Sequence, residues 1–248
     1  MKSIASFVAS ALAALAMITA VPVAAQQMVL VKKTTVTRTV TRLVPPGIER
    51  AETATVARFG PFRVLADGNA ALVGATDNAS PRDFARLLAA YPHTRTLELV
   101  EVPGTMDDVA NLELGRMIRA RGIATLVPKD GSVRSGGVEL FLAGATHSAH
   151  PQAQFAVHAW MDDDGREATA YAPEAPEHRR YISYYTEMGM DAAQARAFYA
   201  MTNSASFHDA RWMTGAEMNR WTGGAALASA ASAIETPQGT QIAYADTL

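Results

Sequence analysis

The feature that most constrains this fold is a regular alternation of short apolar strands with amphipathic helices, which begins near Phe62. Three apolar runs have the length and composition of buried strands: Thr96–Val102, Ile123–Val127 and Phe155–Trp160. A helix is expected over residues 107–121, between the first two strands. Strands that alternate with helices of this kind form parallel βα units with right-handed crossovers. The sequence therefore predicts an α/β fold in which these three strands are parallel neighbours.

Further elements are expected on either side of these strands. Phe62–Leu65 and Ala71–Val73 have the pattern of a short hairpin. Residues 128–134 are expected as a loop that leads into an apolar helix over Gly137–Ala145. The C-terminal third is expected to be helical, and its last helix begins at the capping box Thr214–Glu217.

The N-terminus has the pattern of a secretory signal peptide. Lys2 is followed by the uncharged, apolar stretch Ile4–Val21, which ends at Pro22 and the small residues Val23–Ala25. An uncleaved membrane anchor is the alternative, because this run approaches the length that spans a bilayer. Its high alanine content and its small-residue end favour cleavage. Residues 1–25 are therefore predicted to be removed, which leaves a periplasmic or secreted protein without a membrane span.

Three further segments are expected after the signal peptide. Residues 26–61 are predicted to be an extended lead-in, since valine alternates with polar residues over 32–42. Residues 62–224 form the predicted α/β domain. Residues 225–248, which are rich in Ala, Ser, Thr and Gln, are expected to be a flexible tail.

The composition excludes several classes of function. The net charge of −2 and the hydrophobic content of 49% are those of an ordinary globular protein and give no indication of nucleic-acid binding. Cysteine is absent, which excludes disulfides, thiolate metal sites and cysteine nucleophiles. Any nucleophilic catalysis must use serine, threonine, lysine or a carboxylate.

Three segments carry residues that suit nucleophilic catalysis. Val102–Thr105 is a turn between a strand and a helix, where unpaired backbone N–H groups can hold an oxyanion. Ser135 precedes an apolar helix, where the positive end of the helix dipole and the next backbone N–H can assist a nucleophile. His158 stands alone in an otherwise apolar predicted strand, Phe155–Trp160.

Taken together, these segments resemble the serine peptidases of the Clp-protease-like superfamily, which shares its fold with the crotonases. The resemblance is strongest to periplasmic, mostly uncharacterised Clp-like proteins of bacteria. The order of an oxyanion turn, a serine before an apolar helix and a histidine strand is kept, and the helix ends in Phe141–Gly144, the family's Phe-Leu-Ala-Gly. The resemblance covers about residues 64–224 and implies Clp/crotonase-like stacked ββα units with a helical C-terminal region.

The resemblance also implies a role for each residue of the site. Ser135 would be the nucleophile and His158 the general base. The backbone N–H groups of Thr105 and Gly136 would form the oxyanion hole. Asp209, about fifty residues after His158, would be the acid that orients the imidazole. Each residue also has a structural alternative, namely a helix N-cap for Ser135, a core histidine for His158 and a surface acid for Asp209.

Two loops depart from the family pattern. Val102 and Thr105 replace the usual serine and second glycine of the oxyanion turn, and Arg134 and Gly136–Gly137 alter the serine loop. A Cβ at position 105 is expected to restrict the turn, because glycine is used there for positive φ or for close approach. These departures weaken the case for activity more than the case for the fold.

A metal site is not expected. His147 and His150, even together with His158, lack an accompanying carboxylate in their loop. Asp162–Gly165 resembles the start of a calcium loop, but Pro173 stands where the bidentate acid is needed, so a solvated turn is predicted.

The sequence thus predicts an exported Clp-like serine hydrolase that acts on a peptide or other acyl bond without a cofactor. The first alternative is a catalytically weak or inactive Clp-fold binding protein of the periplasm. Crotonase-type chemistry on a thioester ranks last, because export of coenzyme A substrates is not expected. The expected partner is the peptide or acyl substrate, and a homo-oligomer remains open because many of the relatives form rings.

Overall fold

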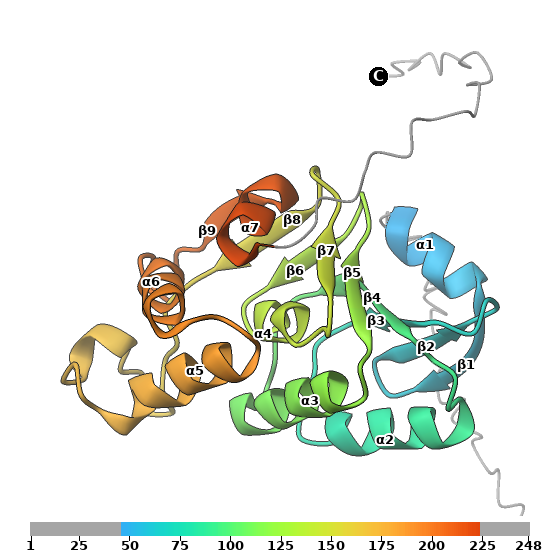
Figure 1. Ribbon diagram of the computed structural model, residues 1–248, viewed down its shortest axis with the longest axis horizontal. Helices are drawn as coiled ribbons and strands as arrows, with labels where there is room; N and C mark the ends of the chain where they lie inside the picture. The colour runs from blue at the N-terminus through green and yellow to red at the C-terminus, as the bar shows by residue number, and fades with distance from the viewer. Residues whose placement is uncertain (1–45, 224–248) are drawn as a thin grey trace, which may run out of the picture. The chain divides into compact units, whose positions relative to one another are not determined.

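The structure is a computed structural model that describes residues 46–223 (Figure 1). The predicted signal peptide, the first part of the lead-in and the predicted tail lie outside the described residues. The elements follow in this order: α1 (Pro46–Thr53), β1 (Thr55–Phe59), β2 (Phe62–Leu65), β3 (Ala70–Val73), α2 (Ser80–Ala90), β4 (Thr96–Val102), α3 (Asp108–Ala120), β5 (Ala124–Val127), β6 (Ser132–Arg134), α4 (Gly137–Leu142), β7 (His147–Ala149), β8 (Gln154–Val157), a 3-10 turn (Ala168–Ala170), α5 (Pro176–Glu187), α6 (Ala192–Thr202), β9 (Arg211–Thr214) and α7 (Gly215–Thr222). None of these helices is both long enough and apolar enough to cross a membrane.

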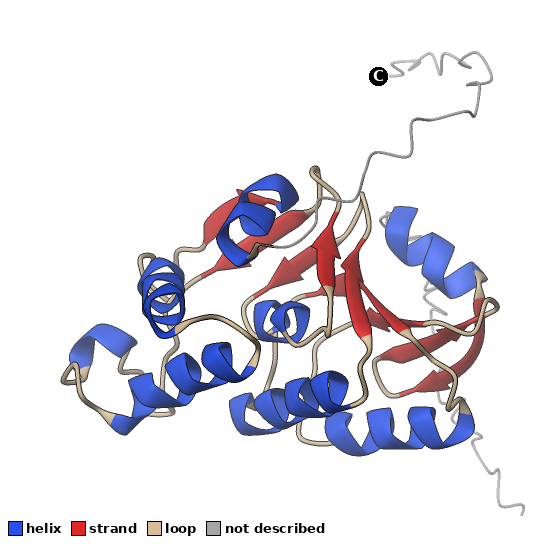
Figure 2. Ribbon diagram, in the orientation of Figure 1, coloured by secondary structure: helices blue, strands red, loops and turns tan. Residues whose placement is uncertain are grey.

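The strands form one sheet that branches at β4 (Figures 1 and 2). β1, β2 and β3 are antiparallel, and β3 continues in parallel to β4. The first residues of β4 pair with β5, whereas its last residues pair with β6. β5 then pairs with β7, and β6 with β8, all in parallel, before β9 closes the order antiparallel to β8.

Two successive ββα units follow from this branching. The first consists of β5, β6 and α4, and the second consists of β7, β8 and α5. The helices α5, α6 and α7 make up most of the C-terminal third. The predicted α/β class, with stacked ββα units and a helical C-terminal region, is confirmed.

Three short strands were not expected from the sequence. β6 occupies the end of the predicted loop 128–134. β7 lies in the segment with His147, which was expected to be a loop, and β9 ends at Thr214, the first residue of the predicted capping box. Strands of three or four residues are too short to establish a period-two pattern. The predicted neighbours β4 and β5 do pair in parallel, but β6 separates β4 from β8.

Several predicted boundaries also move. The predicted strand Phe155–Trp160 ends at Val157, so His158 follows the strand instead of lying within it. The predicted helix Gly137–Ala145 ends at Leu142. The described part of the lead-in is not extended throughout, because α1 precedes β1 and β1 pairs with β2.

The two faces of the sheet bury different helices. Successive side chains of a strand point to opposite faces, and in β4 both Leu99 and Val100 are buried. Leu99 belongs to the main core, whereas Val100 packs in a second cluster with Ala51 of α1. α1 therefore covers one face, and α2 and α3 lie on the other side (Figure 1).

The short helix α4 lies at the centre of the main core. All six of its residues are buried, and the ring of Phe141 meets that of Phe155 on β8 edge to face at 5.0 Å. Gly115 of α3 has no room for a Cβ against the Tyr184 hydroxyl, which donates to the Glu139 carbonyl at 2.8 Å. Helices α3 and α5 thus enclose α4 against the sheet.

Side-chain caps are present at the starts of α3, α6 and α7. Asp107 accepts from the Ala110 N–H at 3.0 Å and begins α3. The predicted capping box is confirmed, since Thr214 and Glu217 bond reciprocally at the start of α7.

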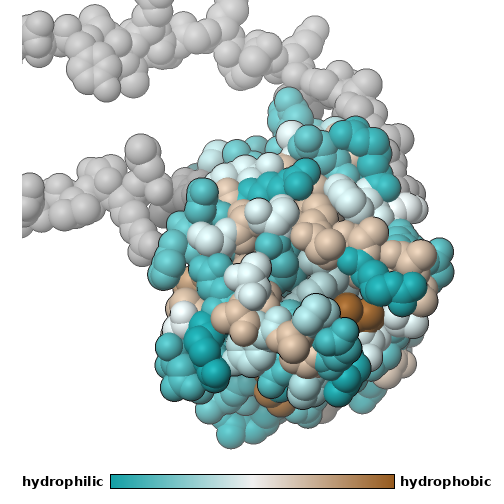
Figure 3. All heavy atoms as spheres, turned by 90° about the vertical axis from the view of Figure 1, so that its left-hand side faces the viewer, coloured by the Kyte–Doolittle hydropathy of each residue, from teal (hydrophilic) through white to brown (hydrophobic). Residues whose placement is uncertain are grey.

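The face that carries α5 and α6 is mostly hydrophilic, with hydrophobic residues in small, separate patches (Figure 3).

Phe155 connects α4 to the strands that hold the site, so Phe155→Ala should destabilise the protein strongly. The Phe155 side chain is fully buried, and in the sheet Phe155 pairs with Val133 of β6 and Met213 of β9. We expect the free energy of unfolding to fall by about 3–5 kcal/mol, measured by urea denaturation. The exposed Val56→Ala is the matched control and should change it by less than about 0.5 kcal/mol. Equal losses for the two variants would contradict this packing.

Candidate active site

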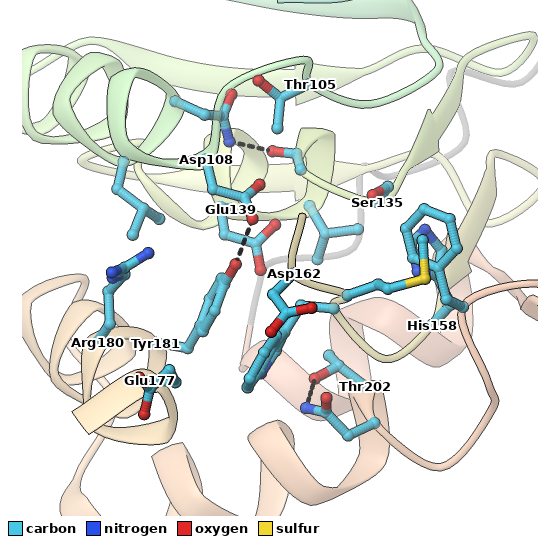
Figure 4. A pocket seen from close by; sticks show the side chains of 18 of the residues that line it. Thr105, Asp108, Ser135, Glu139, His158, Asp162, Glu177, Arg180, Tyr181 and Thr202 are labelled. Carbon is cyan, nitrogen blue, oxygen red and sulfur yellow. Dashed lines mark hydrogen bonds between the residues drawn. The ribbon is translucent and has the colours of Figure 1, made fainter. Parts of the chain in front are cut away.

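The parallel pairing of β6 with β8 brings Ser135 and His158 to one edge of the sheet. Arg134, the last residue of β6, pairs with Ala156 of β8, and the Ser135 N–H donates to the Ala156 carbonyl at 3.0 Å. Ser135 and His158 each follow the carboxyl end of their strand. Both side chains line one cavity of about 770 Å³ (Figure 4).

Ser135 has a strained backbone. It is the only non-glycine residue with positive φ between residues 46 and 223, at φ 47°. A residue in such a region costs about 1–3 kcal/mol and persists only where its surroundings impose it. Here the Ser135 N–H is held by Ala156, and the Ser135 carbonyl accepts from the Val138 N–H at 2.8 Å. A serine on a tight strand-to-helix turn is the arrangement that exposes a nucleophilic hydroxyl.

The turn after β4 packs directly against Ser135. Gly104 has φ 137°, and a Cβ placed there would lie 3.1 Å from the Cβ of Ser135. Both the conformation and the close approach require glycine. The positive φ falls at Gly104, and Thr105 itself does not have positive φ. The Cβ of Thr105 therefore does not restrict the backbone of the turn as expected.

The Thr105 N–H points away from the segment that pairs with its turn. The Gly104 carbonyl accepts from the Thr76 N–H at 3.1 Å, and the Met106 N–H donates to the Thr76 carbonyl at 2.8 Å. In a trans peptide the N–H points opposite to the preceding carbonyl. The Thr105 N–H is therefore directed away from Thr76, and no described residue accepts it.

The same reasoning applies to Gly136. The Ser135 carbonyl points toward the Val138 N–H, so the Gly136 N–H of that peptide points the opposite way, out of the helix. Within residues 46–223 it has no hydrogen-bond partner. The two N–H groups predicted for the oxyanion hole are thus both unpaired in the structure.

Asn111 connects the two turns and was missed in the sequence. Its Nδ2 donates to the Gly136 carbonyl at 2.7 Å, and its Oδ1 accepts from the Thr76 hydroxyl at 2.8 Å. The Asn111 side chain is buried on α3. The sequence feature that could have identified Asn111 is its helical spacing from the apolar residues Leu114 and Ile118, which places this polar residue on the buried face of the helix.

Thr105 and Gly136 also fit each other sterically. A Cβ on Gly136 would lie 2.7 Å from the Cγ2 of Thr105 and 3.1 Å from the Nδ2 of Asn111. The Thr105 hydroxyl is occupied locally, since it donates to the Asp107 carbonyl at 3.0 Å and accepts from the Asp107 N–H at 3.1 Å. The two departures from the family pattern are therefore complementary, with a bulky residue facing a glycine.

The His158 ring is held by the backbone. Its Nδ1 lies 2.8 Å from the Ala159 carbonyl, which can only accept, so Nδ1 carries a hydrogen; in the neutral ring the lone pair is then on Nε2. The ring of Phe207 packs edge-on against it at 4.9 Å. No hydrogen bond joins the His158 ring to the Ser135 hydroxyl within the described residues.

Asp209 lies outside the cavity lining. Its side chain is exposed, and its N–H donates to the Ser206 carbonyl at 3.0 Å in a turn before β9. None of the hydrogen bonds of the described residues connects Asp209 to His158; the Ala159 carbonyl occupies Nδ1 instead. The assignment of Asp209 as the acid stays a prediction.

Glu139 is a second residue that was missed. It lies on α4, four residues after Ser135 in the sequence, and it lines the cavity although its side chain is buried. Desolvation raises the pKa of its carboxyl to about 7, against the lowering effect of the Tyr185 hydroxyl, which donates to Oε1 at 2.8 Å. The signal in the sequence was one charge in the apolar run of α4.

The cavity lining combines acidic and apolar side chains. Six carboxyl side chains and a single guanidinium, that of Arg180, line it: Asp107, Asp108, Glu139, Asp162, Asp163 and Glu177. The lining also includes the exposed hydrophobic residues Met106, Val109 and Phe207.

The residues once considered for a metal have other contacts. His147 packs against Phe141, and its Nε2 lies 3.4 Å from the Thr222 carbonyl. Asp162 accepts from the backbone N–H groups of Asp164 and Arg166 and forms a turn. Residues 46–223 contain no group of three side chains placed to hold a metal ion.

Comparison with known proteins gives similarity to solved structures alone. No protein-family model matches the chain, and no curated protein matches it. Two solved structures of a membrane-bound stomatin-specific protease, 1510-N, are similar at 16% identity and a TM-score of 0.45. One is a mutant in complex with a substrate peptide, where the match covers 64% of this chain and 73% of that chain. The other is a different mutant, with coverages of 64% and 77%.

The contact between the two turns predicts an energetic coupling between positions 105 and 136. Gly136→Ala should lower the free energy of unfolding by about 1–3 kcal/mol, because the new Cβ meets the Thr105 methyl group. In a Thr105→Ser background, which keeps the hydroxyl but removes that methyl, the same change should cost less, with a coupling of about 0.5–3 kcal/mol. Urea denaturation of the four proteins measures this coupling. The same cost in both backgrounds would show that the turns do not touch.

Proposed function

We propose that this protein is an exported serine hydrolase of the Clp-like type, which cleaves a peptide or other acyl bond. The observation that carries the proposal is the strained Ser135, held at a strand-to-helix turn beside two unpaired backbone N–H groups. His158 lines the same cavity, and the Ala159 carbonyl accepts from its Nδ1, which leaves Nε2 as the basic nitrogen of the neutral ring. These are the groups that acyl transfer by a serine requires.

In this mechanism the Ser135 Oγ attacks the carbonyl carbon while its proton passes to the His158 Nε2. The negative charge on the substrate oxygen is stabilised by the N–H groups of Thr105 and Gly136. The protonated His158 then gives its proton to the leaving group, and an acyl-serine remains. Water, deprotonated by His158, releases the acid and restores the serine.

Asn111 acts as a positioning residue in this scheme. It joins the Gly136 carbonyl to the Thr76 hydroxyl, and the Thr76 backbone holds the turn that carries Thr105. The spacing of the two oxyanion donors therefore depends on one buried side chain. The Ala159 carbonyl holds the imidazole in the tautomer that a general base needs, and Asp209 is proposed to stabilise the charged imidazolium.

A Clp-fold binding protein is the second candidate. The observation that favours it is that no described hydrogen bond joins Ser135 to His158. Such a protein would use the same cavity, with its apolar residues Met106, Val109 and Phe207, to hold a peptide without cleaving it.

A fluorophosphonate probe distinguishes the two candidates, because it forms a covalent bond only with an activated serine. We expect labelling of the wild-type protein, its complete loss in Ser135→Ala, and a rate lower by about 10²-fold or more in His158→Ala. Ser183→Ala, an exposed serine of α5, is the control and should label normally. Absence of labelling in a folded wild-type protein would support the binding protein and reject the hydrolase.

We also propose that the protein is exported and that its signal peptide is removed. The support is the apolar, uncharged run Ile4–Val21 followed by Pro22 and small residues. Mass spectrometry of protein from the native cell envelope should give a mature N-terminus within a few residues of Gln26. An intact Met1 in a membrane fraction would indicate an uncleaved anchor instead.

A further inference from the structure

The inner end of the cavity contains a buried carboxyl group that is only partly satisfied. The Glu139 residue is 7% exposed, and its Oε1 accepts from the Tyr185 hydroxyl at 2.8 Å. The other donor to this carboxyl among the described residues is the Glu139 backbone N–H, and the second oxygen, Oε2, is not sealed from the cavity. Figure 4 shows the Glu139 side chain directed into this space. A carboxylate in so buried a residue is stabilised by each further hydrogen bond, so Oε2 can accept a donor from a ligand in the cavity.

A second carboxyl group lies beside it. Asp108, at the start of α3, accepts from the Tyr181 hydroxyl at 2.6 Å, and its negative charge also raises the pKa of Glu139 (Figure 4). The tyrosine hydroxyls orient the two carboxyl groups, because each donates its one hydrogen, but they do not neutralise them. Two adjacent acids without a counter-ion are arranged to receive a cation.

The neighbouring guanidinium groups do not fill this role. Arg116 of α3 pairs with Glu187 at 2.6 Å, and Arg119 donates to the Gly144 carbonyl at 2.6 Å. Arg180, on the cavity wall, forms no ion pair with Asp108 or Glu139 in the described part of the chain. The position for a positive charge between the two acids is therefore not taken by a side chain of the protein.

The position of the nucleophile limits the shape of the ligand. Ser135 precedes Gly136, the N-cap of α4, and lies four residues before Glu139, and both side chains line the same cavity. The apolar side chains of Val138 and Leu112 line the same cavity. A charged group on a flexible methylene stem, attached to the carbon next to the reacting acyl carbon, suits both features.

We propose that Glu139 and Asp108 form a subsite for the ammonium or guanidinium group of a basic side chain at the acyl position of the substrate. The cleavage of such a substrate rests on the proposed hydrolase function. The binding of the cation does not depend on it. The substrate class is then lysine- or arginine-containing peptides.

The first test is binding without turnover. Nα-acetyl-lysine amide and its uncharged counterpart Nα-acetyl-norleucine amide are titrated into the Ser135→Ala protein by calorimetry. We expect the lysine compound to bind at least about tenfold more tightly, and this preference to disappear in Glu139→Gln and to weaken in Asp108→Asn. Glu113→Gln, an exposed acid on the outer face of α3, is the control and should keep the preference. Equal binding of the two compounds, or a preference that survives both subsite variants, would overturn the subsite.

The second test uses pH. The groups that face Glu139 are Asp108 from α3 and Tyr181, Tyr184 and Tyr185 from α5, with Arg116 and Arg180 farther away. The raised pKa of Glu139, about 7, means that its charged form is lost as the pH falls through that value. Affinity for the lysine compound should therefore rise from pH 6 to pH 8 and level off above, and this rise should be absent in Glu139→Gln. A pH-independent affinity would contradict the role of Glu139.

The outcomes separate this proposal from the proposed function. Lysine binding without probe labelling of Ser135 would support the subsite and reject the hydrolase. Probe labelling without any preference for lysine over norleucine would support the hydrolase and reject the subsite.

Discussion

The parallel pairing of the three-residue strand β6 with both β4 and β8 determines where every group of the site lies. Val133 pairs with Val102 on one side, and Arg134 pairs with Ala156 on the other. Because parallel strands end at the same edge of a sheet, the turns after β4, β6 and β8 emerge together. These turns carry Thr105 with its unpaired N–H, Ser135 and His158, so one short strand aligns three segments that are far apart in the sequence.

The strain at Ser135 is supported by the same pairing. A positive φ at a serine is unfavourable by itself, and it is stabilised by the hydrogen bond from the Ser135 N–H to β8 and by the packing of Gly104 on its Cβ. Asn111 then fixes the peptide that follows. The substitution of threonine for glycine at position 105 is compatible with this arrangement, because Gly136 leaves room for its methyl group. Fold and nucleophile thus depend on the same contacts.

The sequence was sufficient to predict the elements that have strong local patterns. It was insufficient for the elements and residues whose structure depends on contacts with distant segments. α3, β4 and the capping box of α7 follow from apolar spacing and cap residues and were predicted nearly to the residue. β6 has three residues, and only its two neighbours make it a strand. Asn111 and Glu139 escaped because their partners lie 25 and 46 residues away. Local sequence patterns do not predict contacts over such separations. The assignment of Asp209 relied on its position in the sequence alone, and no contact among the described residues supports it.

Two exceptions to ordinary folding rules occur within five residues of each other. Ser135 has a backbone conformation that a serine rarely adopts, and Glu139 places a carboxyl group in a helix that is otherwise fully apolar and buried. A leucine at position 139 would extend the apolar core, and a glycine at position 135 would relieve the strain. The Glu139 carboxyl also accepts from the buried Tyr185 hydroxyl, and both side chains line the same cavity. Departures from local rules concentrate at functional sites, and here they coincide on one short turn and helix. The same segment therefore carries both the proposed nucleophile and the carboxyl group that is proposed to bind a basic substrate side chain.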